Sequence, residues 1–560
     1  MDDSFAGDKE AAKLESASSR RYQGGWITFP FMIVTMASLT LAASGWMSNL
    51  VVYLIEKFNM SNVDAAQVMN VVNGSTNLIP VVGAILADSF LGCYTVIWIS
   101  SSISLLGITL LILTVTIDSM RPQPCNILAP NPICSSPSKL QYVALYTAFT
   151  LATTGAGGTR FTNGTMGADQ FSNPKDQTTY FNWYFFTLYT ASVIGATAVV
   201  YVEDSVSWAV GFGICVAANA IGLLVFLLGS TFYRYVKPKS SPFTALARVL
   251  VASIRKRHIR PSPDSEDYYN GPNGNSKTRT TLGTPTESFR FLNRAAWKTE
   301  GDLNPNGSIA KMWKICTVEE VEDLKSLIRI FPLWSSSIFL GTPIGIQASL
   351  TILQTLVVDR HLGPHFQFPV GSILVISLIS TSIFIFLYDT ILLTSWKKIF
   401  GKIPTPFQRI GIGHLFNVLG MVISALVETK RLKMAQSAHH QNISVLWLMP
   451  QLMLVGIGEA FHFPGQVALY YQEFPASLKG ISTAMISLLI GIAFYLSTAI
   501  IHFVRKVSGW LPDDINEGKL DNFYWSLAVI GVVNFGYFSF CAWLYRYRRI
   551  DEQVSEDDTK

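Results

Sequence analysis

The chain has 560 residues, of which 49% are hydrophobic and 14% are charged, and its mean hydropathy is +0.34. Soluble globular domains carry about 25% charged residues, so this composition excludes an ordinary soluble protein. The formal net charge of +5 does not indicate a nucleic-acid partner, because the basic residues flank apolar segments and do not line one continuous face.

Apolar segments follow one another along the chain, and nearly all reach the roughly 20 residues that a helix needs to cross a bilayer. In lipid the backbone must satisfy its own hydrogen bonds, so such segments form helices. They are 29–55, 68–87, 95–117, 140–160, 184–202 and 209–232, followed by 328–358, 373–393, 410–427, 445–463, 481–504 and 523–545. The sequence predicts an all-α membrane protein with twelve transmembrane helices in two six-helix bundles.

A polar segment divides the chain into two halves. Residues 260–303 are rich in Pro, Ser, Gly, Asn and charge, which predicts a solvated linker. Residues 241–259 have apolar and basic side chains at helical spacing, which predicts an amphipathic helix at the membrane surface. Six helices, a long link and six more helices are the layout of the major facilitator superfamily. The predicted parts are 1–28, a bundle at 29–235, a linker at 236–322, a bundle at 323–546 and a tail at 547–560.

Lys and Arg gather at the linker, at the ends of the helices on its side and after the last helix. The positive-inside rule therefore predicts that the linker and both termini are cytoplasmic. The first 25 residues are polar and mixed in charge, so they predict no cleavable signal peptide, and residues 1–28 are expected to form a cytoplasmic segment. The basic residues on the opposite side leave the rule satisfied by majority only: Lys430, Arg431, Lys433, Arg505 and Lys506.

Two cysteines, Cys125 and Cys134, share the Pro-rich loop between the third and fourth predicted helices, which this topology places outside the cell. An external loop permits a disulfide, and two free thiols are an equal alternative.

Charged residues inside the predicted helices are the candidates for chemistry, because each costs at least ~2.5–3.5 kcal/mol in the bilayer core. Arg160 ends a run of small residues at 153–159, and Glu459 lies in the middle of the tenth helix. We expect these two charges to face each other across a cavity between the bundles, or else to form an ordinary salt bridge. His462 follows Glu459 by three residues on the same helical face, although a lone His on an apolar helix is commonly a packing residue.

No motif predicts enzymatic chemistry. The glycine-rich run 155–160 lacks the Gly-Lys-Ser/Thr ending of a phosphate-binding loop and lies within a predicted helix. No His-Glu-x-x-His, Cys-x-x-Cys or Gly-x-Ser-x-Gly motif occurs. We therefore predict no enzyme activity, no metal and no cofactor.

Several short motifs are distributed over nearly the whole chain. They are Gly24-Gly25-Trp26, Asn-Leu-Val-Val-Tyr-Leu at 49–54, Ala-Asp-Ser-Phe-Leu-Gly at 87–92, Gly-Ala-Asp-Gln-Phe at 167–171, Phe-Asn-Trp-Tyr-Phe-Phe at 181–186, Asp359-Arg360-His361 and Gly-Glu-Ala-Phe at 458–461. With these motifs the chain resembles the plant nitrate/peptide transporter family. That family is the plant branch of the proton-dependent oligopeptide transporters, and it has the major facilitator fold.

The chain departs from this family at its proton-coupling motif. Family symporters carry Glu-x-x-Glu-Arg/Lys in the first helix, where this sequence has Met36, Leu39 and Thr40 at the three ionisable positions. The family's helix-four Lys is replaced by Arg160, and its helix-ten Glu is retained as Glu459. The resemblance therefore implies a substrate site without the usual proton carriers of the first bundle.

Other family positions also differ. A nitrate-binding His found on helix seven in some members falls at Ile344, and the basic residue after the 87–92 motif is Cys93. The helix-five Ile-Asn-x-Gly element reads Leu-Tyr-Thr-Ala at 188–191, which places Tyr189 in the implied site. The residues implied to bind substrate are Arg160, Tyr189, Glu459 and His462.

This pattern resembles the nitrate-excretion clade of the family, whose members release nitrate, with some relatives moving chloride. The planar donors of Arg160 suit the planar oxygens of nitrate, and an anion that leaves an inside-negative cell gains ~2.3 kcal/mol per charge per 100 mV. We predict passive nitrate or chloride efflux at the plasma membrane. The alternatives are a proton-coupled symporter of nitrate, peptides or organic anions, and a membrane-embedded sensor whose linker at 236–322 binds a regulatory kinase or another protein.

Overall fold

The computed structural model describes residues 24–124, 135–160, 162–236, 242–258, 267–271, 285–305, 308–437, 442–474 and 482–545. Over these ranges the chain is helical, with a few isolated β-bridges and no extended strand. The question of a disulfide between Cys125 and Cys134 lies outside the described residues.

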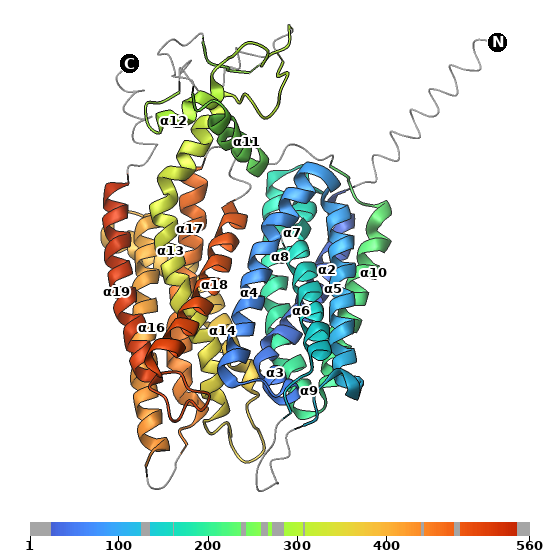
Figure 1. Ribbon diagram of the computed structural model, residues 1–560, viewed down its shortest axis with the longest axis vertical. Helices are drawn as coiled ribbons and strands as arrows, with labels where there is room; N and C mark the ends of the chain where they lie inside the picture. Colours follow the sequence, from blue (N-terminus) through green and yellow to red (C-terminus); the bar gives the residue numbers. More distant parts are fainter. Residues whose placement is uncertain are drawn as a thin grey trace, which may run out of the picture.

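Two helical bundles stand side by side, and each is continuous in sequence (Figure 1). The first contains α2 (Phe29–Ser48), α3 (Leu50–Phe58), α4 (Asn62–Leu86), α5 (Cys93–Thr116), α6 (Lys139–Arg160), α7 (Thr162–Ala168), α8 (Pro174–Ile194), α9 (Val200–Ser205) and α10 (Trp208–Leu228). The second contains α13 (Val318–Leu356), α14 (Val375–Leu387), α15 (Leu393–Phe400), α16 (Pro406–Ala435), α17 (Met449–Glu473), α18 (Ser482–Ser508) and α19 (Leu520–Leu544). The predicted all-α fold of two bundles is confirmed.

Among the described residues, 11 helical segments are long and apolar enough to cross a membrane. The remaining long helix of the first bundle is α6, which packs against α4 and α5. Its 22 residues end in small and polar side chains and in Arg160, so its composition is less apolar than that of its neighbours. Together with α6, the segments make the predicted set of twelve.

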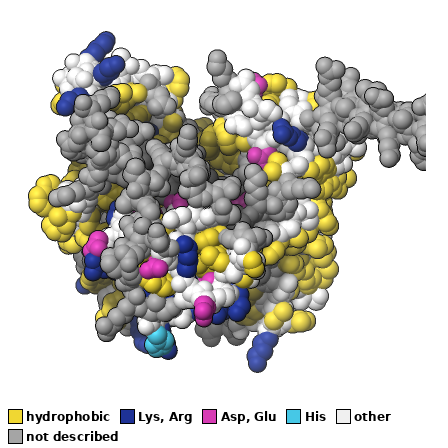
Figure 2. Space-filling model, turned by 90° about the horizontal axis from the view of Figure 1, so that it is seen from above, with side chains coloured by type: hydrophobic (Ala, Val, Ile, Leu, Met, Phe, Trp, Pro, Cys, Tyr) yellow, Lys and Arg dark blue, Asp and Glu magenta, His cyan; other side chains and the backbone are white. Residues whose placement is uncertain are grey.

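The surface of the molecule fits a bilayer around the bundles. Seen from the end that carries the linker, hydrophobic side chains lie around the sides, while Lys, Arg, Asp and Glu appear on the end face (Figure 2). Because lipid tails accept apolar side chains and exclude charge, this distribution places the bundles in the membrane and the linker end in water. We call the opposite end of the bundles the distal end.

The bundles meet at and beyond the midpoints of α4 and α18, towards the distal end. Gly74 of α4 lies against the Tyr495 ring and the Gly491 carbonyl, so a methyl group added there would be 3.0 Å from the ring. Ser75 and Tyr495 share a 2.7 Å hydrogen bond. At the distal end, Arg505 of α18 forms 2.7 Å ion pairs with Asp64 of α4 and with Asp513. In the described residues, the hydrogen bond and the ion pair between α4 and α18 therefore hold the two bundles together in their distal half.

Three of the five basic residues that oppose the predicted orientation have partners in the structure. Arg431 is buried and donates to both carboxylate oxygens of Glu428 at 2.7 and 2.8 Å. Arg505 binds two aspartates, and Lys430 lies 3.4 Å from the centre of the Trp447 ring. Because these cations are paired within the protein, they weigh less against a cytoplasmic linker than the sequence suggests.

The described parts of the linker form more structure than predicted. The predicted amphipathic helix is observed as α11 (Pro242–Arg255), but the prediction of a solvated centre at 260–303 was wrong for its described parts. A small core joins α11, α12 (Arg290–Asn293) and the start of α13. Its buried members include Val249, Ala252, Tyr268, Leu292, Ala295, Ala296 and Cys316. The apolar residues of this core are few and are separated by charged residues. The polar composition of the segment therefore gave no indication of a core.

An ion pair between Lys256 and Asp302 closes this linker core. The two groups are 2.7 Å apart, and their side chains are 6% and 1% exposed. Burial alone raises the pKa of Asp302, but the hydrogen bonds from Lys256 and Thr299 outweigh it and hold the pKa below its usual value. The pair therefore stabilises the linker above the ordinary pKa of Asp, and this stability is lost as the pH falls through the lowered pKa.

We predict that Lys256→Met loosens the linker core, because an unpaired buried carboxylate costs about 3–5 kcal/mol. Hydrogen–deuterium exchange should become faster in residues 285–305 and remain unchanged in the bundles. Arg290→Met is the matched control, since the pair of Arg290 with Glu287 is exposed. Equal exchange in wild type and Lys256→Met would show that the pair has no structural role.

Candidate substrate-binding site

Glycines place Arg160 close to the neighbouring helices. An added methyl group at Gly155 or Gly158 would collide with the serines of α5, and one at Gly157 would lie 2.8 Å from Ile79 of α4. These contacts require the absence of side chains, so the small-residue run lets α6 pack directly against α4 and α5. Arg160 is the last residue of α6, directly beyond this close contact.

Arg160 has most of its hydrogen-bonding capacity free. Its Nη1 donates to Oδ1 of Asn77 at 3.2 Å, and its backbone carbonyl accepts from the Tyr184 hydroxyl at 2.7 Å. Among the described residues, no carboxylate oxygen lies within 4.0 Å of the Arg160 guanidinium, so Arg160 forms no ion pair there. The side chain of Arg160 is exposed. A guanidinium carries five N–H donors, so the remaining donors are available to an anion.

Glu459 and Tyr189 lie in the same region as Arg160. Glu459 of α17 is partly buried, and its Oε2 accepts a 3.3 Å hydrogen bond from Thr381 of α14. Tyr189 of α8 is partly buried and lies within electrostatic reach of both Arg160 and Glu459. The structure thus brings a cation, a phenol and a carboxyl from three helices into one region between the bundles.

The expected direct contact between Arg160 and Glu459 is not formed in this conformation. Each side chain instead has a polar partner in its own bundle, Asn77 for Arg160 and Thr381 for Glu459. The bundles are held together by contacts at and beyond the midpoints of α4 and α18, and no comparable contact joins the two charged groups among the described residues. Asn77, Thr381 and Tyr184 were missed in the sequence, although polar residues inside apolar segments could have indicated them.

His462 lies apart from this group. It is 1% exposed, and its ring packs against His414 of α16 with ring centroids 5.4 Å apart. Gly413 of α16 also contacts its Cβ. Three residues along a helix rotate a side chain by about 60° from its starting direction, which is enough to turn His462 from the side of Glu459 to the interface with α16.

The first helix offers no titratable group at the positions of the family's proton-coupling motif. Met36 and Leu39 of α2 are buried, and Leu39 contacts the helix α10 at Gly222. Thr40 is partly buried and donates to the Met36 sulfur at 3.7 Å. On α13, Ile344 packs on the apolar core. These positions fill space and carry no charge.

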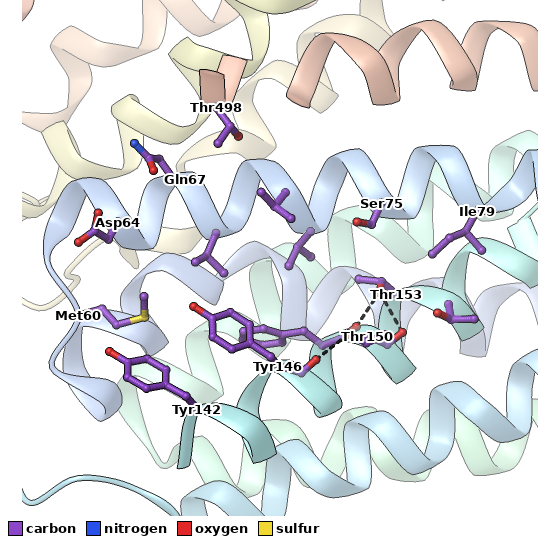
Figure 3. A pocket seen from close by; sticks show the side chains of 15 residues that line it. Met60, Asp64, Gln67, Ser75, Ile79, Tyr142, Tyr146, Thr150, Thr153 and Thr498 are labelled. Carbon is purple, nitrogen blue, oxygen red and sulfur yellow. Dashed lines mark hydrogen bonds between the residues drawn. The ribbon is translucent and has the colours of Figure 1, made fainter. Parts of the chain in front are cut away.

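A separate groove of about 690 Å³ runs between α4 and α6 in the distal half, with Thr498 of α18 at its edge (Figure 3). Tyr142 and Tyr146 of α6 lie along one side of it, and Ser75 of α4 lies along the other (Figure 3). Its only charged lining residue is Asp64, and neither Arg160, Tyr189 nor Glu459 lines it. An acidic, mostly apolar lining does not suit an anion, so the groove is not the candidate site.

Comparisons with known proteins agree with this architecture. A model of the POT family (PTR2) matches residues 94–516. Two Arabidopsis thaliana relatives, Protein NRT1/PTR FAMILY 2.6 and 2.7, are each 51% identical, and each match covers 100% of this chain and 99% of the relative. The chain therefore belongs to the POT family, and within it is similar to NRT1/PTR proteins of plants. It is a membrane transporter and no enzyme.

Solved structures show the same fold. An auto inhibited POT family peptide transporter superimposes with a TM-score of 0.69 at 16% identity, covering 93% of this chain and 97% of that one. The POT family transporter PepTSo gives a TM-score of 0.67 at 15% identity, with 92% and 98% covered.

We predict that Arg160→Ala removes anion binding, because it deletes the cation and its donors. Arg160→Lys keeps the charge but loses the planar fork, so it should bind more weakly and retain some transport. Binding of nitrate to the purified protein, measured by calorimetry, would test both variants. Arg121→Lys, in an exposed pair at the distal end, is the control. Unchanged binding in Arg160→Ala would place the substrate site elsewhere.

Proposed function

We propose that this protein transports nitrate, or another small monovalent anion such as chloride, by passive low-affinity efflux without strict proton coupling. The observation that supports this proposal most directly is Arg160, an exposed guanidinium inside the membrane-spanning region with no described carboxylate partner. A permanent cation in this setting is costly unless water or an anion solvates it. A transported anion would provide that solvation.

The neighbours of Arg160 suit a small planar anion. The guanidinium presents parallel N–H donors in one plane, which match the oxygens of nitrate. Tyr189 adds a hydroxyl within electrostatic reach of Arg160, and Asn77 orients the guanidinium by its 3.2 Å hydrogen bond. The planar N–H donors, the neighbouring hydroxyl and the single positive charge favour a monovalent oxyanion over a larger zwitterion.

The composition of α2 supports transport without strict proton coupling. This helix, Phe29–Ser48, contains no acidic, basic or histidine residue. Without a titrating group there, binding of the anion at Arg160 has no proton carrier on the first helix. An inside-negative potential alone drives a monovalent anion outward by ~2.3 kcal/mol per 100 mV. We therefore propose the plasma membrane as the location of the protein, with the linker end in the cytoplasm.

Two alternatives have some support. Glu459 is a partly buried carboxyl without a described cation partner, which favours a proton-coupled symporter of nitrate, peptides or organic anions. A membrane-embedded sensor would use the folded linker at 242–258 and 285–305 as a surface for a kinase or another protein. A measurement of flux separates both alternatives from passive efflux.

We predict that nitrate flux in proteoliposomes follows the electrochemical gradient of nitrate. With the membrane potential clamped, a pH gradient alone should not accumulate nitrate against its own gradient. Liposomes with Arg160→Ala protein provide the control for leak. Uphill accumulation driven by the pH gradient would support the symporter, and the absence of any protein-dependent flux would support the sensor.

We also predict that Glu459→Gln strengthens anion binding. Removing a negative charge from this region removes an electrostatic repulsion of the bound anion, so nitrate should bind severalfold more tightly. Nitrate affinity and turnover should be measured on one preparation, with Asp118→Asn at the exposed distal pair as control. If affinity and turnover both remain at wild-type values, Glu459 has no part in the mechanism.

A further inference from the structure

A second carboxyl group is buried in the first bundle, well outside the candidate substrate site. Glu203 of α9 is 1% exposed, and neither of its carboxylate oxygens has a hydrogen-bond partner. No cation forms an ion pair with it among the described residues, whereas the adjacent Asp204 pairs with Arg360 at 4.0 Å. Of the two neighbouring acids of α9, Glu203 is therefore buried without a charged partner, whereas Asp204 is paired with a cation.

The groups that surround Glu203 are apolar or neutral. Its side chain lies directly on Gly211 of α10, where an added methyl group would collide with it. Cys215 of α10 and Asp204 are the titratable groups near it. The amide of Asn49, at the break between α2 and α3, lies beside it, but its Nδ2 forms no hydrogen bond of acceptable geometry.

An ionised carboxylate in such a place loses its hydration without any compensating partner, which costs several kcal/mol. Protonation removes that cost, because the neutral acid is far cheaper to bury. Burial and the absence of partners thus favour a proton on Glu203 as long as the site stays closed.

Glu203 lies next to the surface where the first bundle meets the second. Gly371 contacts the Asn49 side chain so closely that an added methyl group would be 2.6 Å from Oδ1. Ser372 donates to the Ala196 carbonyl at 2.8 Å, within the π turn η4 (Gly195–Val199) that precedes α9. Tyr201 of α9 stacks with Phe366 at 6.4 Å. Opening of the distal end must separate these contacts on both sides of Glu203.

We propose that Glu203 is a proton-binding site that links protonation to the opening of the distal end. In the closed state the carboxyl holds its proton. When the bundles separate, water reaches the carboxyl, and the proton passes to that water and leaves a hydrated carboxylate. The proton returns from the same side on closure, so protonation controls opening without moving protons across the membrane.

The sign of the effect follows from linkage. Because the closed state binds the proton more tightly than the open state, raising the pH on the distal side favours opening, by up to about tenfold per pH unit for one proton. Acid on that side favours closure. The inference holds for any transported anion and does not depend on Arg160.

Glu203→Gln imitates the protonated form at nearly the same size, and Glu203→Met does so without polar atoms. Infrared difference spectra between purified wild-type and variant protein isolate the carboxylic acid signal of Glu203 without any substrate. We expect this protonated signal in wild type near neutral pH and its absence from both variants. Glu56→Gln, an exposed acid on α3 that bonds to Trp208, should leave the signal in place.

Anion efflux should then be measured while the pH on the distal side is varied, with the orientation in liposomes fixed by protease access to the linker. Wild type and Glu56→Gln should slow severalfold in acid, whereas both Glu203 variants should lose this dependence and transport at the slow acid rate. Absence of a protonated Glu203 signal, or wild-type pH dependence in both variants, would overturn the proposal. The infrared result stands even if nitrate proves not to be the substrate.

Discussion

The contact between α4 and α18 around Gly74 and Gly491 holds the two bundles together in this conformation. Because glycine has no side chain, the helices approach until the Tyr495 ring and the backbone itself form the interface. Arg160, the last residue of α6, lies on the linker side of this contact, and its side chain is exposed. Glu203 lies on the distal side, near the contacts of Gly371 and Ser372 with the first bundle. This contact therefore lies between the two groups, with Arg160 on the linker side of it and Glu203 on the distal side.

The buried charges of the chain divide into those with partners and those without. Arg431 and Glu428 neutralise each other inside the second bundle, and Gln354 adds a 2.7 Å hydrogen bond to the same carboxylate. This group is complete and has a structural role. Arg160, Glu459 and Glu203 are incomplete: each lacks a described charged partner. A membrane protein retains such costly groups where a ligand, a proton or a second conformation completes them.

The fold could be predicted from sequence because the membrane permits few solutions for an apolar segment of 20 residues or more. Arg160 and Glu459 were identifiable for the same reason, since a charge in such a segment stands out. Tyr189 came only from the family resemblance. For His462 the sequence left a substrate role and a packing role open, because helical spacing gives an angle without identifying the neighbours. Glu203 was missed because the predicted helix ended at residue 202, whereas α9 continues to Ser205. The linker core was missed because its contacts are formed between distant residues.

The linker core is attached to the second bundle. Phe243 and Leu246 of α11 pack on the apolar cluster of that bundle, and the linker core includes the first turns of α13. Its described hydrogen bond to the first bundle is the 3.5 Å contact of Thr244 with Ser89. The linker should therefore travel with the second bundle as one rigid piece when the bundles rock. A fluorophore on residues 285–305 paired with another on the first bundle would report the rocking angle directly, at a position that water reaches and lipid does not.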